Sequence, residues 1–153
     1  MPGKYSEVWN ATNTQSTTVP INTLTGAATC RPRLSEFVHG SDYSTFGTEV
    51  SGTFLLQRHS TAPAGGTAVT PRPLDPADAA ALSTAMQGPS IGAPTLGVSL
   101  FQWSQNFRAT FRWVAQPGYE FVIPATAAAG ISLLPTVVSG AAVNWTGTFM
   151  WLE

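Results

Sequence analysis

The stretch FQWSQNFRATFRW, residues 101–113, alternates between apolar and polar side chains almost without interruption. Its odd positions include five large aromatic residues, and its even positions are polar or charged. A β-strand places successive side chains on opposite faces, so this period of two predicts a strand with one buried face. The chain is therefore expected to fold around a β-sheet whose inner face is lined by aromatic rings.

The alternation extends from Val98 to Val114, which is longer than the usual strand of about five or six residues. We expect the stretch either to bend or to split near residues 104–106 into a hairpin. Because the alternation continues across that point, a single bent strand is favoured.

Further strands are expected where β-branched and aromatic residues lie between turn-forming residues. Pro135 interrupts one of these segments and cannot donate a ladder hydrogen bond, so that segment is expected to be an edge strand or to contain a bulge. The last segment alternates again, with Trp145, Phe149 and Trp151 on one face. The expected strands are residues 33–39, 53–59, 119–123, 131–138 and 142–152.

Residues 1–25 are rich in Thr, Asn and Ser and have no apolar helical face. We expect an extended N-terminal arm or edge strand, anchored by Tyr5 and Trp9, that lies along its own domain or reaches a neighbour. Residues 76–87 are the only helical signal. Asp75 can cap this helix, and Pro76 suits its first position. Together the segments predict an all-β fold, an antiparallel β-sandwich or jelly-roll-like domain over residues 26–153.

Charged residues make up 10% of the 153 residues, against about 25% in typical soluble domains. Either Thr- and Ser-rich segments must therefore keep the surface soluble in place of charge, or neighbouring subunits must cover it. Six arginines and one lysine form no basic patch, which disfavours nucleic-acid binding. The start of the chain has no apolar segment of a signal peptide, and no apolar run is long enough to span a membrane.

The sequence contains no recognisable catalytic motif, and neither an enzymatic activity nor a cofactor is expected. His39 and His59 lie near strand ends and could share a metal with Asp42 or Glu36, although two ordinary histidines are the simpler interpretation. Cys30 is the only cysteine and is expected to be a small buried residue. The glycosylation patterns at Asn10 and Asn144 are attributed to chance.

Two non-enzymatic functions remain. A sugar-binding β-sandwich would expose aromatic side chains, for which the candidates are Trp9, Tyr43, Phe46 and Tyr119. A structural subunit of a shell would instead show few surface charges, an extended arm and a two-sheet body that packs against neighbours.

Four segments resemble small structural proteins encoded among the head genes of tailed bacteriophages. They are LTGAATCRPRLSEFVHGS (24–41), LLQRHSTAPAGGTAVTPRPLDPADAAA (55–81), NFRATFRWVAQPGYEFVIPATAAAGISL (106–133) and VNWTGTFMWLE at the end of the chain. Members of this group resemble capsid decoration, or cement, proteins. The resemblance covers most of residues 24–153 and brings no catalytic residues with it.

This resemblance implies a non-enzymatic virion protein that is made in the host bacterial cytoplasm and stabilises the outer capsid shell. Its expected partners are the major capsid protein and copies of itself, in a trimer or a dimer, with no nucleic acid and no membrane. The candidate interface residues are Tyr5, Trp9, Arg108 and Arg112. The two arginines face either acidic groups of a neighbouring subunit or solvent. The alternative is a carbohydrate-binding or adhesion domain of a fibre or tail.

Overall fold

The computed structural model describes residues 3–13, 19–41, 51–88, 91–135 and 143–153. Within these ranges the chain forms strands β1 to β12 and contains no helix. All paired strands are antiparallel, and they form two sheets that face each other, as expected of a β-sandwich. The prediction of an all-β, antiparallel fold is confirmed.

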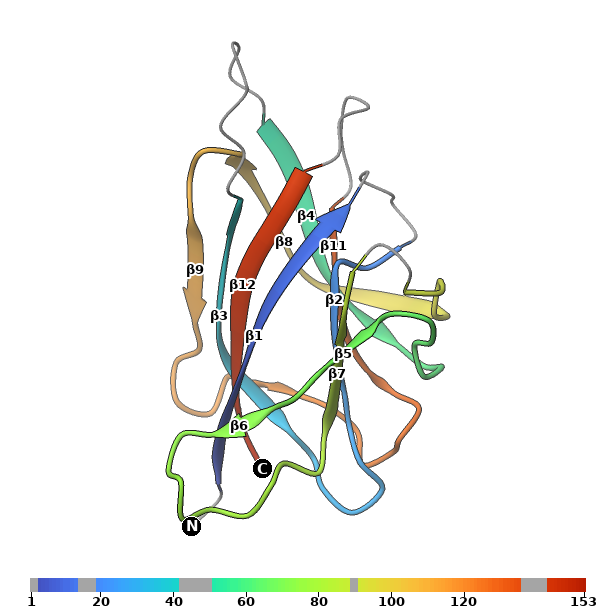
Figure 1. Ribbon diagram of the computed structural model, residues 1–153, viewed down its shortest axis with the longest axis vertical. Helices are drawn as coiled ribbons and strands as arrows, with labels where there is room; N and C mark the ends of the chain where they lie inside the picture. Colours follow the sequence, from blue (N-terminus) through green and yellow to red (C-terminus); the bar gives the residue numbers. More distant parts are fainter. Residues whose placement is uncertain (1–2, 14–18, 42–50, 89–90, 136–142) are drawn as a thin grey trace.

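The first sheet, sheet A, contains the N-terminal and C-terminal strands side by side (Figure 1). Its order is β10 (Phe121–Val122), β3 (Arg33–Ser41), β12 (Val143–Leu152), β1 (Lys4–Asn13) and β6 (Arg72–Pro73), and β9 (Phe111–Val114) also pairs with β3.

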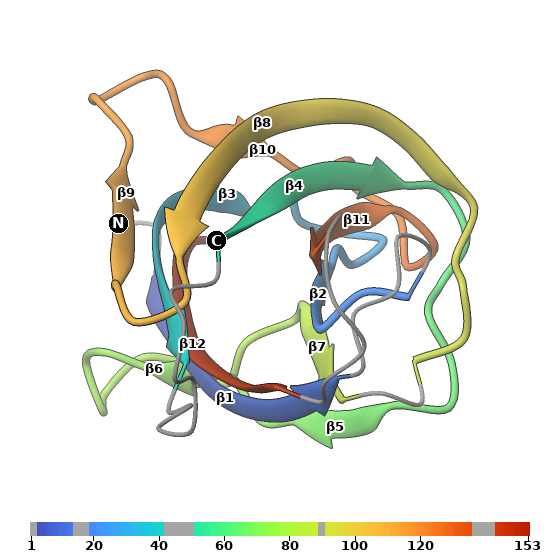
Figure 2. The ribbon, with the colours of Figure 1, turned by 90° about the horizontal axis from the view of Figure 1, so that it is seen from above.

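Most of the second sheet, sheet B, lies behind sheet A, with its edge strand β5 beside β1, and the two sheets curve around the core when seen from above (Figure 2). Its order is β5 (Thr67–Val69), β7 (Thr84–Gln87), β2 (Asn22–Thr25), β11 (Gly130–Pro135), β4 (Ser51–His59) and β8 (Leu96–Asn106).

Aromatic rings from both sheets fill the space between them. Phe37 of β3 lies 5.3 Å from Trp103 of β8 and 6.1 Å from Phe149 of β12, measured between ring centroids. Trp103 and Phe107 are buried, and Phe101, Phe111 and Trp113 pack against the core from its margin. The aromatic side chains of the alternating stretch thus face the core, as predicted.

The alternating stretch is neither one bent strand nor a hairpin. Its first half is β8 in sheet B, and its second half is β9 in sheet A. A turn separates them, in which the side chain of Asn106 accepts a hydrogen bond from the backbone N–H of Arg108. Because both halves face the same core from opposite sheets, the alternation continues although the strands do not pair.

The prediction of a helix over residues 76–87 is wrong. The carboxylate of Asp75 accepts a hydrogen bond from the backbone N–H of Ala77, which forms a single turn. The chain then enters β7, which pairs with β2 on one side and β5 on the other. Ladder hydrogen bonds and the burial of Ala85 outweigh the local helix propensity.

Residues 4–13 are not an arm but β1, which pairs with β12 from Lys4↔Leu152 to Asn13↔Val143. Likewise β11 is not an edge strand, since it lies between β2 and β4. Pro135 is its last residue, where the missing N–H costs the ladder least. Residues 136–138 of that predicted strand lie outside the described residues.

Candidate functional site

The two histidines lie in different sheets and do not form a metal site. His39 is on β3 and His59 on β4. Glu36 is held by Arg112, and Asp42 lies outside the described residues. Among the residues that the structure describes, no three His, Cys, Asp or Glu side chains gather closely enough to hold a metal ion.

His39 is fully buried among aromatic rings. Its ring lies 4.4 Å from Phe54 and 5.0 Å from Trp145, between centroids. Neither ring nitrogen has a partner with hydrogen-bond geometry within the described chain, although the side chain of Gln105 lies close enough to oppose the effect of burial on the pKa. Burial lowers the pKa of His39 from 6.5 to about 4, so the ring is neutral at pH 7.

His59 is also buried, but both of its ring nitrogens are hydrogen-bonded. They lie 3.2 Å from Oγ1 of Thr25 and 2.9 Å from Oγ of Ser132. Burial lowers the pKa of His59 to about 4 as well. This histidine connects three neighbouring strands of sheet B, so its role is structural.

Glu7 is a buried carboxyl group that the sequence analysis did not single out. Its Oε1 accepts a hydrogen bond of 2.8 Å from the side-chain amide of Asn22, and its Oε2 has no partner in the described chain. Burial raises the pKa of Glu7 from 4.5 to about 8, so the group is mainly protonated at pH 7. A lone protonated carboxyl without an adjacent base or a cleft has no catalytic geometry.

Tyr5 and Trp9 were predicted to anchor an interface, but their side chains belong to this domain's own core. Tyr5 donates a hydrogen bond to the carbonyl of Ala79 and stacks on Trp151. Trp9 is 1% exposed. Neither side chain is available at the surface.

Arg108 and Arg112 are both exposed, as predicted. Arg108 lies in the turn between β8 and β9. Arg112 lies on the outer face of sheet A, where its Nε donates to the carboxylate of Glu36 at 2.6 Å. This hydrogen bond raises the pKa of Arg112. Since the pair is exposed, it contributes little to stability.

Of the candidates for sugar binding, Tyr119 is the one that the structure places at the surface. Its side chain is 75% exposed after the Gln116–Gly118 turn, in which Gly118 has a positive φ of 88°. Trp9 is buried, and Tyr43 and Phe46 lie outside the described residues.

The described residues leave much of the outer face of sheet A uncovered. We call it the A face. It is formed by the outward side chains of four strands: Ser6, Val8 and Asn10 of β1, Thr146, Thr148 and Met150 of β12, Glu36 and Val38 of β3, and Arg112 and Val114 of β9.

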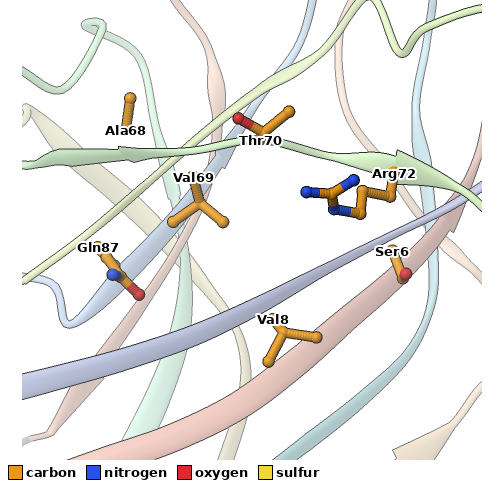
Figure 3. A pocket seen from close by; sticks show the side chains of 7 residues that line it. All are labelled: Ser6, Val8, Ala68, Val69, Thr70, Arg72 and Gln87. Carbon is orange, nitrogen blue, oxygen red and sulfur yellow. The ribbon is translucent and has the colours of Figure 1, made fainter.

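Two shallow hollows meet at Val8, which is 74% exposed. One, of about 430 Å³, lies over the middle of the A face and is lined mainly by uncharged residues such as Val38, Thr146 and Thr148. The other, of about 320 Å³, lies between β1 and the β5–β6 segment. Figure 3 shows Val69 and Arg72 extending over this second hollow from one side and Ser6 and Val8 bordering it on the other.

The outer face of sheet B differs because the chain itself covers much of it. Thr23, Ser132 and Leu134 point outward from β2 and β11, yet all three are fully buried. The connections formed by residues 60–66 and 91–95 run along this outer side (Figure 2) and bond to each other from Gly92 N–H to the Ala64 carbonyl. The A face therefore stands out as a surface that offers contact to another molecule.

The A face was not predicted because residues 1–25 were interpreted as an extended arm or an edge strand. Residues 4–12 alternate, with Tyr5, Glu7, Trp9 and Ala11 inward and Lys4, Ser6, Val8 and Asn10 outward. Period two was a sufficient signal for a strand, but the Thr-, Asn- and Ser-rich composition of the segment favoured the interpretation as an arm or edge strand.

No protein-family model and no curated protein matches this sequence. No helix that could cross a membrane occurs in the described part of the chain.

Proposed function

We propose that this protein is a non-enzymatic structural subunit of a tailed-bacteriophage virion, which decorates the outer capsid shell and stabilises it through contacts between subunits. Its partners in this proposal are the major capsid protein and further copies of itself. The protein acts at the capsid surface after synthesis in the host cytoplasm. The two-sheet body and the resemblance of four segments within residues 24–153 to capsid decoration proteins are consistent with this role.

The observation that carries the proposal is the A face. It is broad, uncovered and nearly free of charge at its middle. A surface of this kind suits contact with protein better than contact with water.

Many copies on one shell would make weak individual contacts effective. A decoration protein meets several neighbours at once, so its contacts act together as avidity rather than as isolated affinities. Uncharged contacts also persist when the salt concentration changes, because little of their free energy is electrostatic.

The test is binding of the purified chain to capsids of the phage that encodes it, stripped of this protein. We expect saturable co-sedimentation at a fixed number of copies per capsid, and an increase in the temperature at which the capsid ruptures. Capsids that bind no chain, or purified virions that contain none, would refute the proposal.

A second candidate is a carbohydrate-binding or adhesion domain, which the exposure of Tyr119 favours. Exposed aromatic rings stack on sugars, but one ring in a turn is a minimal site. Glycan-array binding that disappears in the Tyr119→Ala variant, with no capsid binding, would replace the first proposal with this one.

A further inference from the structure

The middle strand of the A face projects no charge outward. The outward residues of β12 are Asn144, Thr146, Thr148, Met150 and Leu152. On either side of it, Val8 of β1 and Val38 of β3 lie opposite Thr148 in the same row across the sheet. This row is uncharged until it reaches Arg112 on β9.

The charges at the margins of the A face are largely balanced within the chain. Arg112 is paired with Glu36 at 2.6 Å, and Arg33 lies close enough to Glu120 to interact electrostatically. At the opposite margin, Lys4 and Arg72 adjoin the turn that carries Asp75 and Asp78. Neither sign dominates, so this surface has no electrostatic preference for an acidic or a basic partner.

A two-fold axis brings each side chain that lies on it against its own copy. Such a contact is unfavourable for a charged residue and carries no such penalty for Thr, Val or Met. We propose that the A face is covered by the A face of a second copy of this chain, with the two-fold axis along β12. Val8 of one copy then packs near Val38 of the other.

The area of the A face is sufficient for such a contact. Three strands of nine or ten residues and the four residues of β9, at ~3.3 Å per residue and about 4.8 Å between strands, cover about 500 Å². Two such faces bury about 1,000 Å² together, which is the smallest area expected of a specific protein interface. The dimer is therefore expected to be of moderate affinity. This inference deepens the proposed function, because it names the neighbour that covers this surface.

The chain offers a matched pair of valines for the test. Val8 is 74% exposed on the A face, and Val98 is 72% exposed on β8 in the opposite sheet. Analytical ultracentrifugation of the full chain should show a monomer–dimer equilibrium. We expect Val8→Asp to weaken dimerisation at least tenfold, because an unpaired carboxylate would be buried, and Val98→Asp to change it less than twofold. Circular dichroism checks that both variants fold.

Crosslinking provides a second readout. In a Cys30→Ser background, Thr148→Cys should give a covalent dimer with a thiol-reactive crosslinker that spans about 10 Å, because the two thiols face each other across the axis and packed sheets lie about 10 Å apart. Ser104→Cys, exposed on β8, should not. A wild-type protein that stays monomeric at 100 µM, equal effects of the two valine variants, or crosslinking through residue 104 instead of 148 would each overturn the proposal.

The same proteins separate this inference from the proposed function. A wild-type dimer that does not bind capsids would refute the capsid role and leave the A-face dimer intact. A monomer that binds capsids would refute the A-face dimer and leave the capsid role intact.

Discussion

At the scale of single residues, the two histidines form a natural comparison. Burial lowers the pKa of both to about 4, but His59 is hydrogen-bonded to Thr25 and Ser132, whereas His39 has only the nearby side chain of Gln105, without hydrogen-bond geometry. Removing one member of a satisfied buried hydrogen bond leaves the other unpaired at a cost of about 1–3 kcal/mol, whereas removing an unpaired polar group does not.

We therefore predict opposite effects of one substitution. His59→Phe should lower the free energy of unfolding by about 1–3 kcal/mol, since two buried hydroxyl groups lose their partner. His39→Phe should equal or exceed the wild type in stability, because the new ring enters an aromatic cluster that includes Phe54 and Trp145. Urea unfolding followed by tryptophan fluorescence measures both. Equal losses in the two variants would show that hydrogen bonding does not distinguish the sites.

At the scale of elements, the pairing of β1 with β12 depends on a glycine. Gly147 lies opposite Trp9, and a β-carbon at this position would overlap the indole ring. The indole is fully buried and cannot move away into solvent. Gly97 of β8, in contrast, has its nearest atom, the Arg58 carbonyl oxygen, at 3.6 Å from such a β-carbon.

Gly147→Ala is accordingly expected to lower the free energy of unfolding by about 1–3 kcal/mol through overpacking. Gly97→Ala should be neutral or stabilising by up to about 1 kcal/mol, because alanine restricts the unfolded chain. Thermal unfolding by circular dichroism compares the two. A Gly147→Ala variant as stable as Gly97→Ala would contradict the close packing of Trp9 on β12.

At the scale of the whole molecule, three buried ionisable groups act on the pH dependence of folding. The two histidines have a pKa of 6.5 in the unfolded chain and about 4 in the folded protein. Their contribution to stability is present above pH 6.5 and is lost as the pH falls toward 4. Glu7 has a pKa of 4.5 unfolded and about 8 folded, so its contribution is present below pH 4.5 and is lost as the pH rises to 8.

Between pH 4.5 and 6.5 the free energy of unfolding rises with pH, because the two histidines contribute more to its slope than Glu7 does. Above pH 6.5, only Glu7 among these three groups still changes it. Maximum stability is therefore expected near pH 6.5, with a decrease of up to about 1.4 kcal/mol per pH unit toward pH 8. Glu7→Gln keeps an acceptor for Asn22 and should abolish this alkaline decrease while leaving the acid limb in place. Urea unfolding from pH 5 to 8.5 tests this. Parallel profiles of variant and wild type would exclude Glu7 as the cause.

Much of the fold was predictable from local patterns. The strands over residues 33–39, 53–59 and 142–152 were located by period two, and the aromatic inner face followed from the same pattern in residues 101–113. Residues 76–87 were predicted as a helix, although their last four residues form β7. This strand was not predictable, because its partners β2 and β5 are distant in the sequence. Of the candidate interface residues, Arg108 and Arg112 were correctly expected at the surface, whereas Tyr5 and Trp9 are buried.

Along the strands that it predicted, the sequence alone determined which side chains turn inward, because the alternation of the backbone is a local property of extended chain. Only the tertiary structure decided which strands are neighbours, that β8 and β9 enter different sheets, and that the outer face of sheet A stays uncovered while that of sheet B is covered by its own connections. The reason is physical: pairing and burial depend on contacts between residues far apart in the chain, and these are set by the packing of the whole domain.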